Sequence, residues 1–513
     1  MRHQYAALLA TCLLGSASAL LQEVSPSLCD ADVQQYSGYF TLTTGTKLAQ
    51  KHYFYWFFEA RNQPETAPVL LWMTGGPGCS SAVALFGENG PCHVSPDGSF
   101  TTKNNFSWNE VANIIFIDQP AGTGFSYGLG MDHNETSVAN DMYDFLQQFF
   151  TAHPKYSANP FYTFGESFAG HYVPAVTHKI WQMNQQLHAG QVRIPLVGTA
   201  IGNGLVDPLT QFKVQGRPSP STQPNLPGAG GHASLKSERR NPAAPVPARI
   251  CGWLSPTPTL PLSFALLTHS LPPRRDSSAR PCVQYYAEMA VSSNDHKPAV
   301  SNVTHALMRA SLGPCLAAIR ACQAAPATCV LAIDTCNIGQ LLPYTASGMN
   351  PYDMRVKCAK PPLCYDFSNV ANYLGQKAVK AALGVPESRN WADCNRAVAL
   401  SFELSGDWMQ SFQDKLPDQL ASGIRVLVYA GDQDYICNWL GNQAWTREMK
   451  WPGKAAFGAA EVTEWKVHGQ PAGTIQTASN FTFLRVYDAG HMVPRDQPVN
   501  ALAMVKSFIA SEF

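Results

Sequence analysis

Several short runs of this chain are apolar at almost every position, and they restrict the possible folds more than any other feature. They lie at residues 69–73, 113–117, 161–164, 424–430 and 481–487. A strand that is apolar throughout, rather than at alternate positions, is one that helices cover on both faces of its sheet. Each run ends in a loop rich in Gly, Asp or Pro, and helical patterns such as 137–150 and 168–186 lie between the runs. We therefore predict an α/β domain with a largely parallel central sheet.

The run at 161–164 leads directly into GESFA, residues 165–169, and then into a helical pattern. This order of strand, sharp turn and helix is the nucleophile elbow of α/β-hydrolases, which exposes a serine oxygen above the sheet and points helix amides at it. Small residues are needed beside the serine because the strand and helix backbones approach closely. The predicted nucleophile is Ser167, and Ala169 stands where the pattern usually has Gly.

A serine nucleophile needs a base and a carboxylate that orients the base. In this fold the acid and then the histidine follow the serine, each in a loop after a later strand. The loop after 424–430 offers Asp432 and Asp434, and the loop after 481–487 offers His491. The residues alone leave the choice between the two aspartates open.

Amide donors for a developing oxyanion are predicted in WMTGGPGCSS, residues 72–81. Only glycines let backbone amides approach a tetrahedral intermediate closely. We expect the N–H groups of Gly76 and of Phe168, the residue after the serine, to be the two donors. Because an acyl-enzyme route supplies its own nucleophile, we expect no metal and no cofactor.

Between residue 207 and about residue 382 the alternation of strands and helices fails. The stretch 306–336 is rich in Ala and Cys and has a helical pattern, so we predict a helical cap at 207–382, inserted into the sheet domain. The predicted α/β-hydrolase core is then 20–206 together with 383–513.

Residues 214–284 fit neither part. They contain thirteen prolines, eight Lys or Arg and only two acidic residues, without a periodic apolar pattern, a composition typical of disorder. Deleting them would join DPLTQFK to YYAEMA in a smooth transition from loop to helix. Since the segment opens with Val and closes with Gln, as a translated intron can, we hypothesise a retained intron; the alternative is a natural disordered insertion.

The N-terminus predicts a secretory signal peptide over residues 1–19, with Arg2 and His3 before an apolar run and Ala-Ser-Ala at 17–19. No later stretch is apolar for long enough to span a membrane. Lys plus Arg (36) equals Asp plus Glu (36), so no charge field favours nucleic acid or an anionic membrane as a partner. We expect a protein without a membrane anchor in the secretory pathway, either in a vacuole- or lysosome-like compartment or outside the cell.

The fourteen cysteines suit that oxidising compartment. The glycosylation sequons agree with it, at Asn105, Asn134, Asn302 and Asn480. Ten cysteines, an even number, remain when four are set aside: Cys12 in the signal peptide, Cys251 and Cys282 in the unusual segment, and Cys437, which is discussed below. Sequence alone does not pair ten cysteines.

Seven motifs of the chain resemble those of the serine carboxypeptidase family, in particular of carboxypeptidase Y-like and plant type-III members. They are TGGPGCSS, GENGP, DQPAGTGFSY, GESFAGHYVPA, IGNGLVDP, YAGDQDYICNWLGNQAW and DAGHMVPRDQP. The resemblance runs from about residue 35 to the C-terminus and is interrupted only at 214–284. It implies an exopeptidase that acts on peptide and protein C-termini. Whether the protein is a monomer or a homodimer stays open.

The resemblance also implies roles for single residues. The family's nucleophile, base and acid match Ser167, His491 and Asp434. The residues implied to hold the substrate's carboxylate are Trp72, Glu88 and Glu166, with Thr74 where the family commonly has Asn. Cys437 and Met492 match positions of the leaving-residue pocket. The implied disulfides are Cys79–Cys394, Cys315–Cys336, Cys322–Cys329 and Cys358–Cys364, which leaves Cys29 and Cys92 as a fifth pair.

Two carboxyl groups close together in a low-dielectric site share a proton, because both cannot ionise cheaply. A protonated glutamic acid can donate a hydrogen bond to a substrate carboxylate, whereas an ionised pair would repel it. Glu88 and Glu166 therefore predict peptide cleavage with an acidic optimum, and a KM that rises first as the pH is raised.

Two other functions fit the same fold. An acyltransferase that uses sugar esters is one, but such relatives typically carry Asp, and Ser two places beyond the nucleophile, where this chain has Glu166 and Ala169. A catalytically silent binding protein is the other, and an intact set of Ser167, Asp434 and His491 argues against it.

Overall fold

The computed structural model describes residues 23–44, 50–130, 132–216, 282–291 and 298–513. The chain divides into two compact units, of which the first holds Met1–Val214 together with Gln284–Phe513. The second, Gln215–Val283, lies almost entirely outside the described residues, and so do the predicted signal peptide and most of the unusual segment 214–284. The first unit contains all the site residues expected from the sequence.

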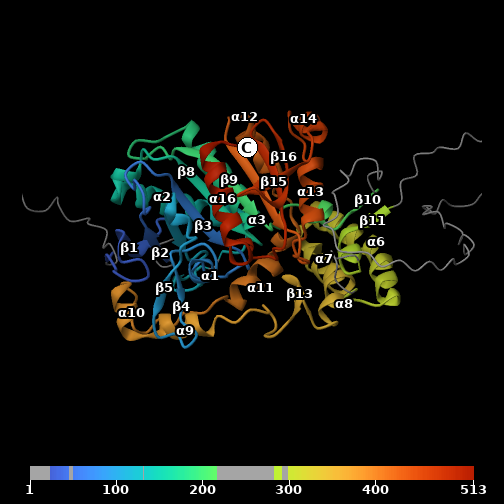
Figure 1. The fold of residues 1–513 in the computed structure, drawn as a ribbon, viewed down its shortest axis with the longest axis horizontal. Coiled ribbons are helices and arrows are strands. Elements are labelled where there is room, and N and C mark those ends of the chain that lie inside the picture. The colour runs from blue at the N-terminus through green and yellow to red at the C-terminus, as the bar shows by residue number, and fades with distance from the viewer. Residues whose placement is uncertain (1–22, 45–49, 131, 217–281, 292–297) are drawn as a thin grey trace, which may run out of the picture. The chain divides into compact units, whose positions relative to one another are not determined.

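A large sheet with a parallel centre forms the middle of this unit (Figure 1), as the apolar runs predict. Its strands, in spatial order, are β1 (Gln35–Thr41), β2 (Lys51–Phe58), β6 (Asn113–Ile117), β3 (Val69–Thr74), β8 (Phe161–Glu166), β9 (Leu196–Gly202), β14 (Arg425–Gly431), β17 (Phe481–Val486), β16 (Gln470–Ala478) and β15 (Thr463–Val467). Strands β6 to β17 in this order are mutually parallel, while β1, β2, β16 and β15 pair antiparallel at the two sides. Strand β7 (Tyr127–Gly128) pairs with β2.

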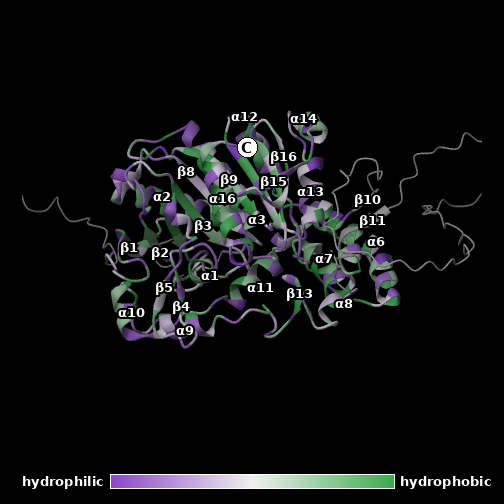
Figure 2. Cartoon of the chain, in the orientation of Figure 1, coloured by the Kyte–Doolittle hydropathy of each residue, from purple (hydrophilic) through white to green (hydrophobic). Residues whose placement is uncertain are grey.

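Both faces of the central strands are buried, which explains why they are apolar throughout. On β3, Leu70 and Trp72 join one hydrophobic cluster, whereas Leu71 and Met73 join the cluster on the opposite face. Figure 2 shows the hydrophobic colour concentrated along these middle strands. Helices cover each face because a sheet that is apolar on both sides cannot face water on either.

The two faces are covered by different helices. Helices α1 (Ala82–Gly87) and α16 (Pro498–Ala510) pack into the first cluster. The second cluster receives α2 (Glu135–Ala152), α3 (Ala169–Gln185), α12 (Leu416–Ala421) and α13 (Trp439–Glu448). The predicted helical patterns at 137–150 and 168–186 correspond to α2 and α3, so both predictions are confirmed.

The predicted helical stretch at 306–336 is also confirmed. It forms α6 (Asn302–Ala324) and α7 (Cys329–Cys336), which pack in a third hydrophobic cluster with residues of the predicted core such as Met409 and Tyr435. Short elements complete this region: α4 (Pro208–Gln211), α5 (Tyr285–Met289), α8 (Leu342–Thr345) and the hairpin of β12 (Met349–Asn350) and β13 (Asp353–Lys357). Strands β10 (Val214–Gly216) and β11 (Cys282–Gln284), which pair with each other, belong mostly to the second unit.

The remaining elements are peripheral. They are β4 (Cys92–Val94), β5 (Thr101–Lys103), α9 (Ser368–Gly375), α10 (Lys377–Ala382), α11 (Arg396–Ser405), α14 (Lys454–Ala459) and α15 (Val493–Asp496). No helix in the described part of the chain combines the length and the apolar character needed to cross a membrane.

Five disulfides join described residues of the first unit. They join Cys29 to Cys92, Cys79 to Cys394, Cys315 to Cys336, Cys322 to Cys329 and Cys358 to Cys364. Four of these pairs are the ones that the family resemblance implies, and Cys29–Cys92 is the pair that remained. Two of them lie within the α6–α7 region, where the cysteines belong to the third hydrophobic cluster, and Cys79–Cys394 ties the loop after β3 to the segment before α11.

Truncating Ile115, which is fully buried at the centre of β6, tests how tightly the sheet is packed. We expect Ile115→Ala to lower the free energy of unfolding by about 2–5 kcal/mol, because it removes buried methyl groups and leaves a cavity. The smaller Ile115→Val change should cost about 0.5–1.5 kcal/mol. Leu129→Ala, at a position 68% exposed, is the control and should leave the denaturation midpoint unchanged.

Candidate active site

Ser167 occupies a strained turn between β8 and α3. Its φ is +68°, in the left-handed region, and its amide donates to the carbonyl of Gly202 at 3.1 Å. It is the only partly exposed residue between 161 and 170; the others there are buried. A Cβ on Gly165 would lie 2.6 Å from the Cβ of Ala169, so the turn needs Gly at one position and nothing much larger than Ala at the other. The structure thus has the geometry of a nucleophile elbow.

Asp434 and His491 meet at the carboxyl ends of β14 and β17. Nδ1 of His491 lies 2.8 Å from Oδ2 of Asp434, and both side chains are buried. Oδ1 of Asp434 accepts the amide of Ile436 at 3.1 Å. Among the described residues no hydrogen bond joins the Ser167 hydroxyl to His491; such bonds often tighten only when substrate is bound.

Asp432, the other aspartate offered by the sequence, has different partners. Its carboxylate pairs with Arg485 at 2.9 Å and accepts the amide of Asp488 at 3.0 Å. Asp432 therefore stabilises the loop that leads to His491, whereas Asp434 contacts the imidazole itself.

Asn203 was not assigned a role from the sequence, although it lies in the quoted motif IGNGLVDP. It follows β9, the strand between β8 and β14, with φ +41°. Its Nδ2 donates to Oδ2 of Asp434 at 2.8 Å, and its Oδ1 accepts the amide of Gly431 at 3.2 Å. The side chain thereby fixes the carboxylate that contacts His491. Its place in that motif was the one signal that could have marked it, because the apolar pattern does not reveal β9.

The glycine loop after β3 presses against the elbow. A Cβ on Gly75 would lie 2.4 Å from the amide nitrogen of Phe168 and 2.6 Å from the carbonyl oxygen of Glu166. Gly76 has φ +109°, a conformation that other residues rarely adopt. Among the described residues, neither Gly76 N–H nor Phe168 N–H donates a hydrogen bond within the protein. Both expected oxyanion donors are therefore available beside Ser167.

Buried Asp118 holds this loop from beneath. Its carboxylate accepts the Ser80 hydroxyl at 2.5 Å, the Ser81 amide at 3.2 Å and the Phe125 amide at 2.8 Å. Ser81 in turn accepts the amide of Thr74 at 3.2 Å. The loop that carries the glycines is thus anchored to the end of β6, a role that the sequence did not indicate.

Glu88 and Glu166 form a buried acidic pair. Each side chain is 2% exposed, and within the described part of the chain neither oxygen of Glu88 accepts from another residue's N–H or hydroxyl group. Burial raises the pKa of Glu88 to about 7, while a hydrogen bond with Glu166 and the charges of His491 and Arg495 act in the opposite direction. Burial, and then repulsion by Glu88, raise the pKa of Glu166 well above its usual range. Both carboxyl groups therefore hold a proton more strongly than ordinary glutamates do.

Trp72 and Thr74, two residues apart on β3, point to the same face. The indole N–H of Trp72 donates to the Thr74 hydroxyl at 3.0 Å. Because that oxygen accepts from Trp72, its own proton remains available to an incoming acceptor. The threonine can therefore take part in binding an anion despite its short side chain.

Cys437 and Met492 are both buried near the triad. Cys437 is the free cysteine of the described residues. Its sulfur lies within 4.8 Å of a carboxylate oxygen of Asp434 and of a ring nitrogen of His491. Burial, together with the negative charges of Asp434 and Glu166, raises the pKa of the Cys437 thiol well above its usual range. The thiol therefore stays neutral and acts as an apolar wall.

The sequons differ in their surroundings. Asn105 and Asn302 are exposed, and Asn134 caps α2 through its oxygen, which accepts the Ser137 amide at 3.0 Å. Nδ2 of Asn480 donates to the carbonyls of Leu420 and Ile424, at 3.0 and 2.7 Å. A glycan would be attached to the Nδ2 atom, which in Asn480 is engaged in these hydrogen bonds. The exposed Asn105 and Asn302 are therefore better glycosylation sites than Asn480.

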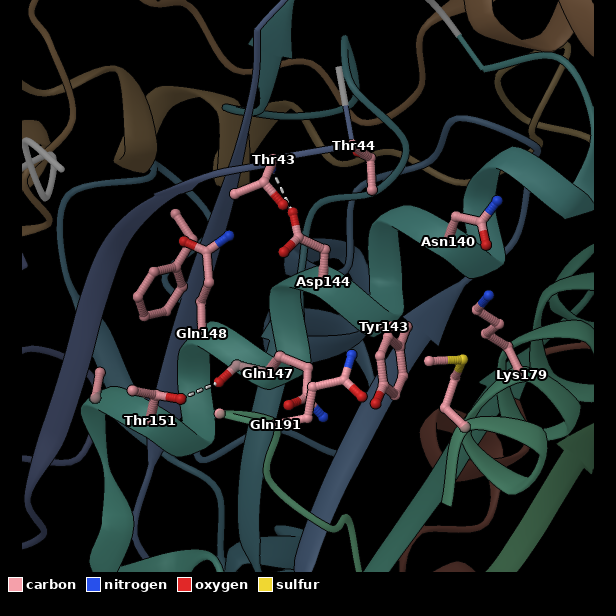
Figure 3. Close-up of a pocket in the computed structure, with 14 residues that line it drawn as sticks. Thr43, Thr44, Asn140, Tyr143, Asp144, Gln147, Gln148, Thr151, Lys179 and Gln191 are labelled. Carbon is pink, nitrogen blue, oxygen red and sulfur yellow. Dashed lines mark hydrogen bonds between the residues drawn. The ribbon is translucent and has the colours of Figure 1, made fainter. Parts of the chain in front are cut away.

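A surface pocket of about 710 Å³ lies away from the triad, along α2 and α3 (Figure 3). None of the site residues expected from the sequence line it. Two of its polar contacts join lining residues to each other: Asp144 accepts the Thr43 amide, and the Thr151 hydroxyl donates to the carbonyl of Gln147 at 2.7 Å. We assign it no part in the chemistry.

The fold and the site together define an α/β hydrolase. Kex1 from Saccharomyces cerevisiae, described as a prohormone-processing carboxypeptidase, shares this fold, with a TM-score of 0.71 at 22% identity over 95% of both chains. A family model described as serine carboxypeptidase matches residues 26–240 and 272–511. The unmatched part between these ranges lies inside the unusual segment 214–284.

Similar proteins of known name agree. Carboxypeptidase Y of Komagataella phaffii is 36% identical over 494 residues, which cover 95% of this chain and 78% of that protein. Serine carboxypeptidase-like 47 of Arabidopsis thaliana is 36% identical over 500 residues, covering 97% and 82%. The chain belongs to the serine carboxypeptidase family and is a serine-type carboxypeptidase.

Gly75→Ala tests the close contact between the glycine loop and the elbow. We expect kcat/KM to fall roughly 100-fold, because the added methyl group would displace the amide of Phe168 and an error of about 1 Å is costly at a reacting centre. Gly313→Ala, in α6 where a Cβ meets no atom within 4 Å, is the matched control and should retain full activity. An unchanged kcat/KM in Gly75→Ala would contradict the assignment of this loop.

Proposed function

We propose that this protein is a carboxypeptidase of the secretory pathway, which removes C-terminal residues from peptides and proteins at acidic pH through an acyl-enzyme on Ser167. One observation carries the proposal: the serine in the left-handed turn directly follows Glu166 of the buried Glu88–Glu166 pair, and His491, buried in a hydrogen bond with Asp434, is near enough for its charge to act on Glu88. The first arrangement suits proton transfer from a hydroxyl, and the second suits recognition of a free carboxylate.

In the proposed mechanism the Ser167 oxygen attacks the carbonyl carbon of the last peptide bond, and its proton passes to Nε2 of His491. The amides of Gly76 and Phe168 bind the oxyanion of the tetrahedral intermediate. His491 then gives the proton to the leaving amine, and a water molecule hydrolyses the acyl-enzyme by the same route. Asp434, held by Asn203, keeps the imidazole in the required tautomer.

Recognition of the substrate's end falls to the residues above β3 and β8. At acidic pH the raised pKa values of Glu88 and Glu166 keep a proton on each carboxyl group, so one O–H can bridge the pair while the other is donated to the substrate's carboxylate. The Thr74 hydroxyl offers a second donor. If both glutamates ionised, the pair would repel the same carboxylate. The site thus selects a chain end rather than an internal peptide bond. Cys437 and Met492 form the wall beside the leaving residue.

The disulfides favour a particular cellular compartment for this protein. Five disulfides favour an oxidising environment such as the secretory route, because cytosolic thiols are kept reduced. An acidic compartment on that route would keep the shared proton in place. The predicted signal peptide at 1–19 is consistent with this destination.

The pH dependence of KM tests the shared proton. The pKa of Glu88 is raised to about 7, so the protonated pair persists at acidic pH and is lost as the pH rises through that value. For a blocked dipeptide with a free carboxylate, KM should be flat below pH ~6 and then rise roughly tenfold per pH unit above the pKa. A KM that stays constant from pH ~4 to ~8 while kcat falls would contradict this role of the glutamates.

Replacing both glutamates provides a second test. The double variant Glu88→Gln, Glu166→Gln keeps donors but has no titrating proton, so the rise of KM with pH should disappear and the affinity for the free carboxylate should fall at acidic pH. The matched control is Glu387→Gln, on a side chain 67% exposed, which should leave the profile unchanged. Wild-type turnover and a wild-type profile in the double variant would refute the proposal.

A further inference from the structure

The β12–β13 hairpin reaches between the loops that carry Asp434 and His491. The carbonyl of Pro351 accepts the amides of Tyr435 and Ile436, at 3.1 and 2.9 Å. The hairpin is therefore hydrogen-bonded to the acid-bearing loop immediately beyond Asp434.

The same hairpin also contacts the base-bearing loop. The carbonyl of Tyr352 accepts the amide of His491 itself at 2.7 Å, and the two rings pack edge to face with centroids 5.1 Å apart. A Cβ on Gly490 would lie 2.5 Å from the Tyr352 carbonyl oxygen, so the two backbones are in direct contact. Any displacement of the hairpin would consequently move His491.

Arg355, in β13, binds the base-bearing loop at two further points. Its Nη1 donates to the carbonyl of Asp488 at 2.6 Å, and its Nη2 lies 2.7 Å from Oδ2 of Asp496. The same oxygen of Asp496 accepts the amide of Gly490 at 2.6 Å. The guanidinium therefore holds the chain at Asp488, before His491, and at Asp496, after it, and Asp496 in turn holds the amide of Gly490.

Asp353 orients this guanidinium. Its two carboxylate oxygens accept Nε and Nη2 of Arg355, both at 2.8 Å, in the planar fork that arginine forms with carboxylates. Arg355 thus has an acceptor for each of its three nitrogens. A lysine, with one point charge, could not hold three separate acceptors in one plane.

We propose that Arg355 is a positioning residue for the general base: it fixes the loop that carries His491 through the Asp488 carbonyl and Asp496, and so keeps the imidazole in line between Asp434 and Ser167. This inference rests on the proposed role of His491. A residue of the predicted cap region, 207–382, would then position a catalytic side chain of the core.

The test compares Arg355→Ala and Arg355→Lys with wild type, using a blocked dipeptide. Because the imidazole would lose its alignment while the carboxylate-binding residues stay in place, we expect kcat to fall roughly 10- to 100-fold in Arg355→Ala with KM within about threefold. Arg355→Lys should retain an intermediate kcat. Lys357→Ala, which removes an exposed cation from the same strand, is the matched control and should behave as wild type.

Chemical rescue separates positioning from a merely structural role. The Arg355 side chain is 27% exposed, so free guanidinium can reach the space that Arg355→Ala leaves. Guanidinium at a non-denaturing concentration should raise kcat of that variant several-fold, whereas sodium chloride at equal ionic strength should not. The rate at which a fluorophosphonate labels Ser167 should fall and recover by the same factors.

The outcomes distinguish the two proposals. If wild type releases amino acids and labels at Ser167, and His491→Ala abolishes both, the proposed function stands. A wild-type kcat in a folded Arg355→Ala protein, or an equal loss in Lys357→Ala, would then overturn the inference alone. If Arg355→Ala does not fold, Arg355→Lys decides: a reduced kcat at unchanged KM supports the inference, and a wild-type kcat contradicts it.

Discussion

The left-handed backbone of Ser167 is the constraint on which the rest of the site depends. It turns the chain sharply from β8 into α3, and it does so only because Gly165, Gly75 and Ala169 leave room for the backbones to meet. The same turn places Glu166, the last residue of β8, beside the nucleophile. A hydroxyl and a carboxyl group are thus neighbours because one strand ends where the helix must begin.

This arrangement gathers several carboxyl groups in a buried place. Glu166 faces the negative charges of Glu88, Asp434 and Asp496, and each of these raises its pKa in addition to the effect of burial. Two interactions reduce the free-energy cost of burying these carboxyl groups close together. In the proposed site a proton remains between Glu88 and Glu166, and arginine side chains oppose the outer charges, with Arg355 paired to Asp496 and Arg495 acting on Glu88. The proposed binding of a carboxylate therefore depends on pH.

The sequence was sufficient to predict the centre of the sheet, because strands buried on both faces are apolar without interruption. It did not reveal β9, whose Gly198 and Gly202 interrupt the apolar pattern. The structure shows why they are there: a Cβ at either position would lie within 2.6 Å of the ring of Tyr162 or Tyr429. The antiparallel strands at the two sides of the sheet were not predicted, since their pairing depends on partners distant in the chain.

The candidate site shows the same difference between residues that a local sequence pattern marks and residues whose role depends on distant contacts. Ser167 and His491 could be placed because each follows a recognisable strand, and the family resemblance selected Asp434, which the structure places against His491. Asn203, Asp118 and Arg355 escaped notice because their importance lies in contacts with residues far away in the sequence. No local pattern marks a side chain whose task is to hold a distant loop.

The most direct test of the central claim is an infrared titration of the protonated carboxyl groups. The shared proton predicts that the carbonyl band of a buried carboxylic acid persists up to pH about 7, the pKa to which burial raises Glu88, and that the band is altered in Glu88→Gln and in Glu166→Gln. If no such band remains above pH ~5, where ordinary carboxyl groups have ionised, or if both variants leave it unchanged, the glutamates do not share a proton and the account of carboxylate recognition is wrong.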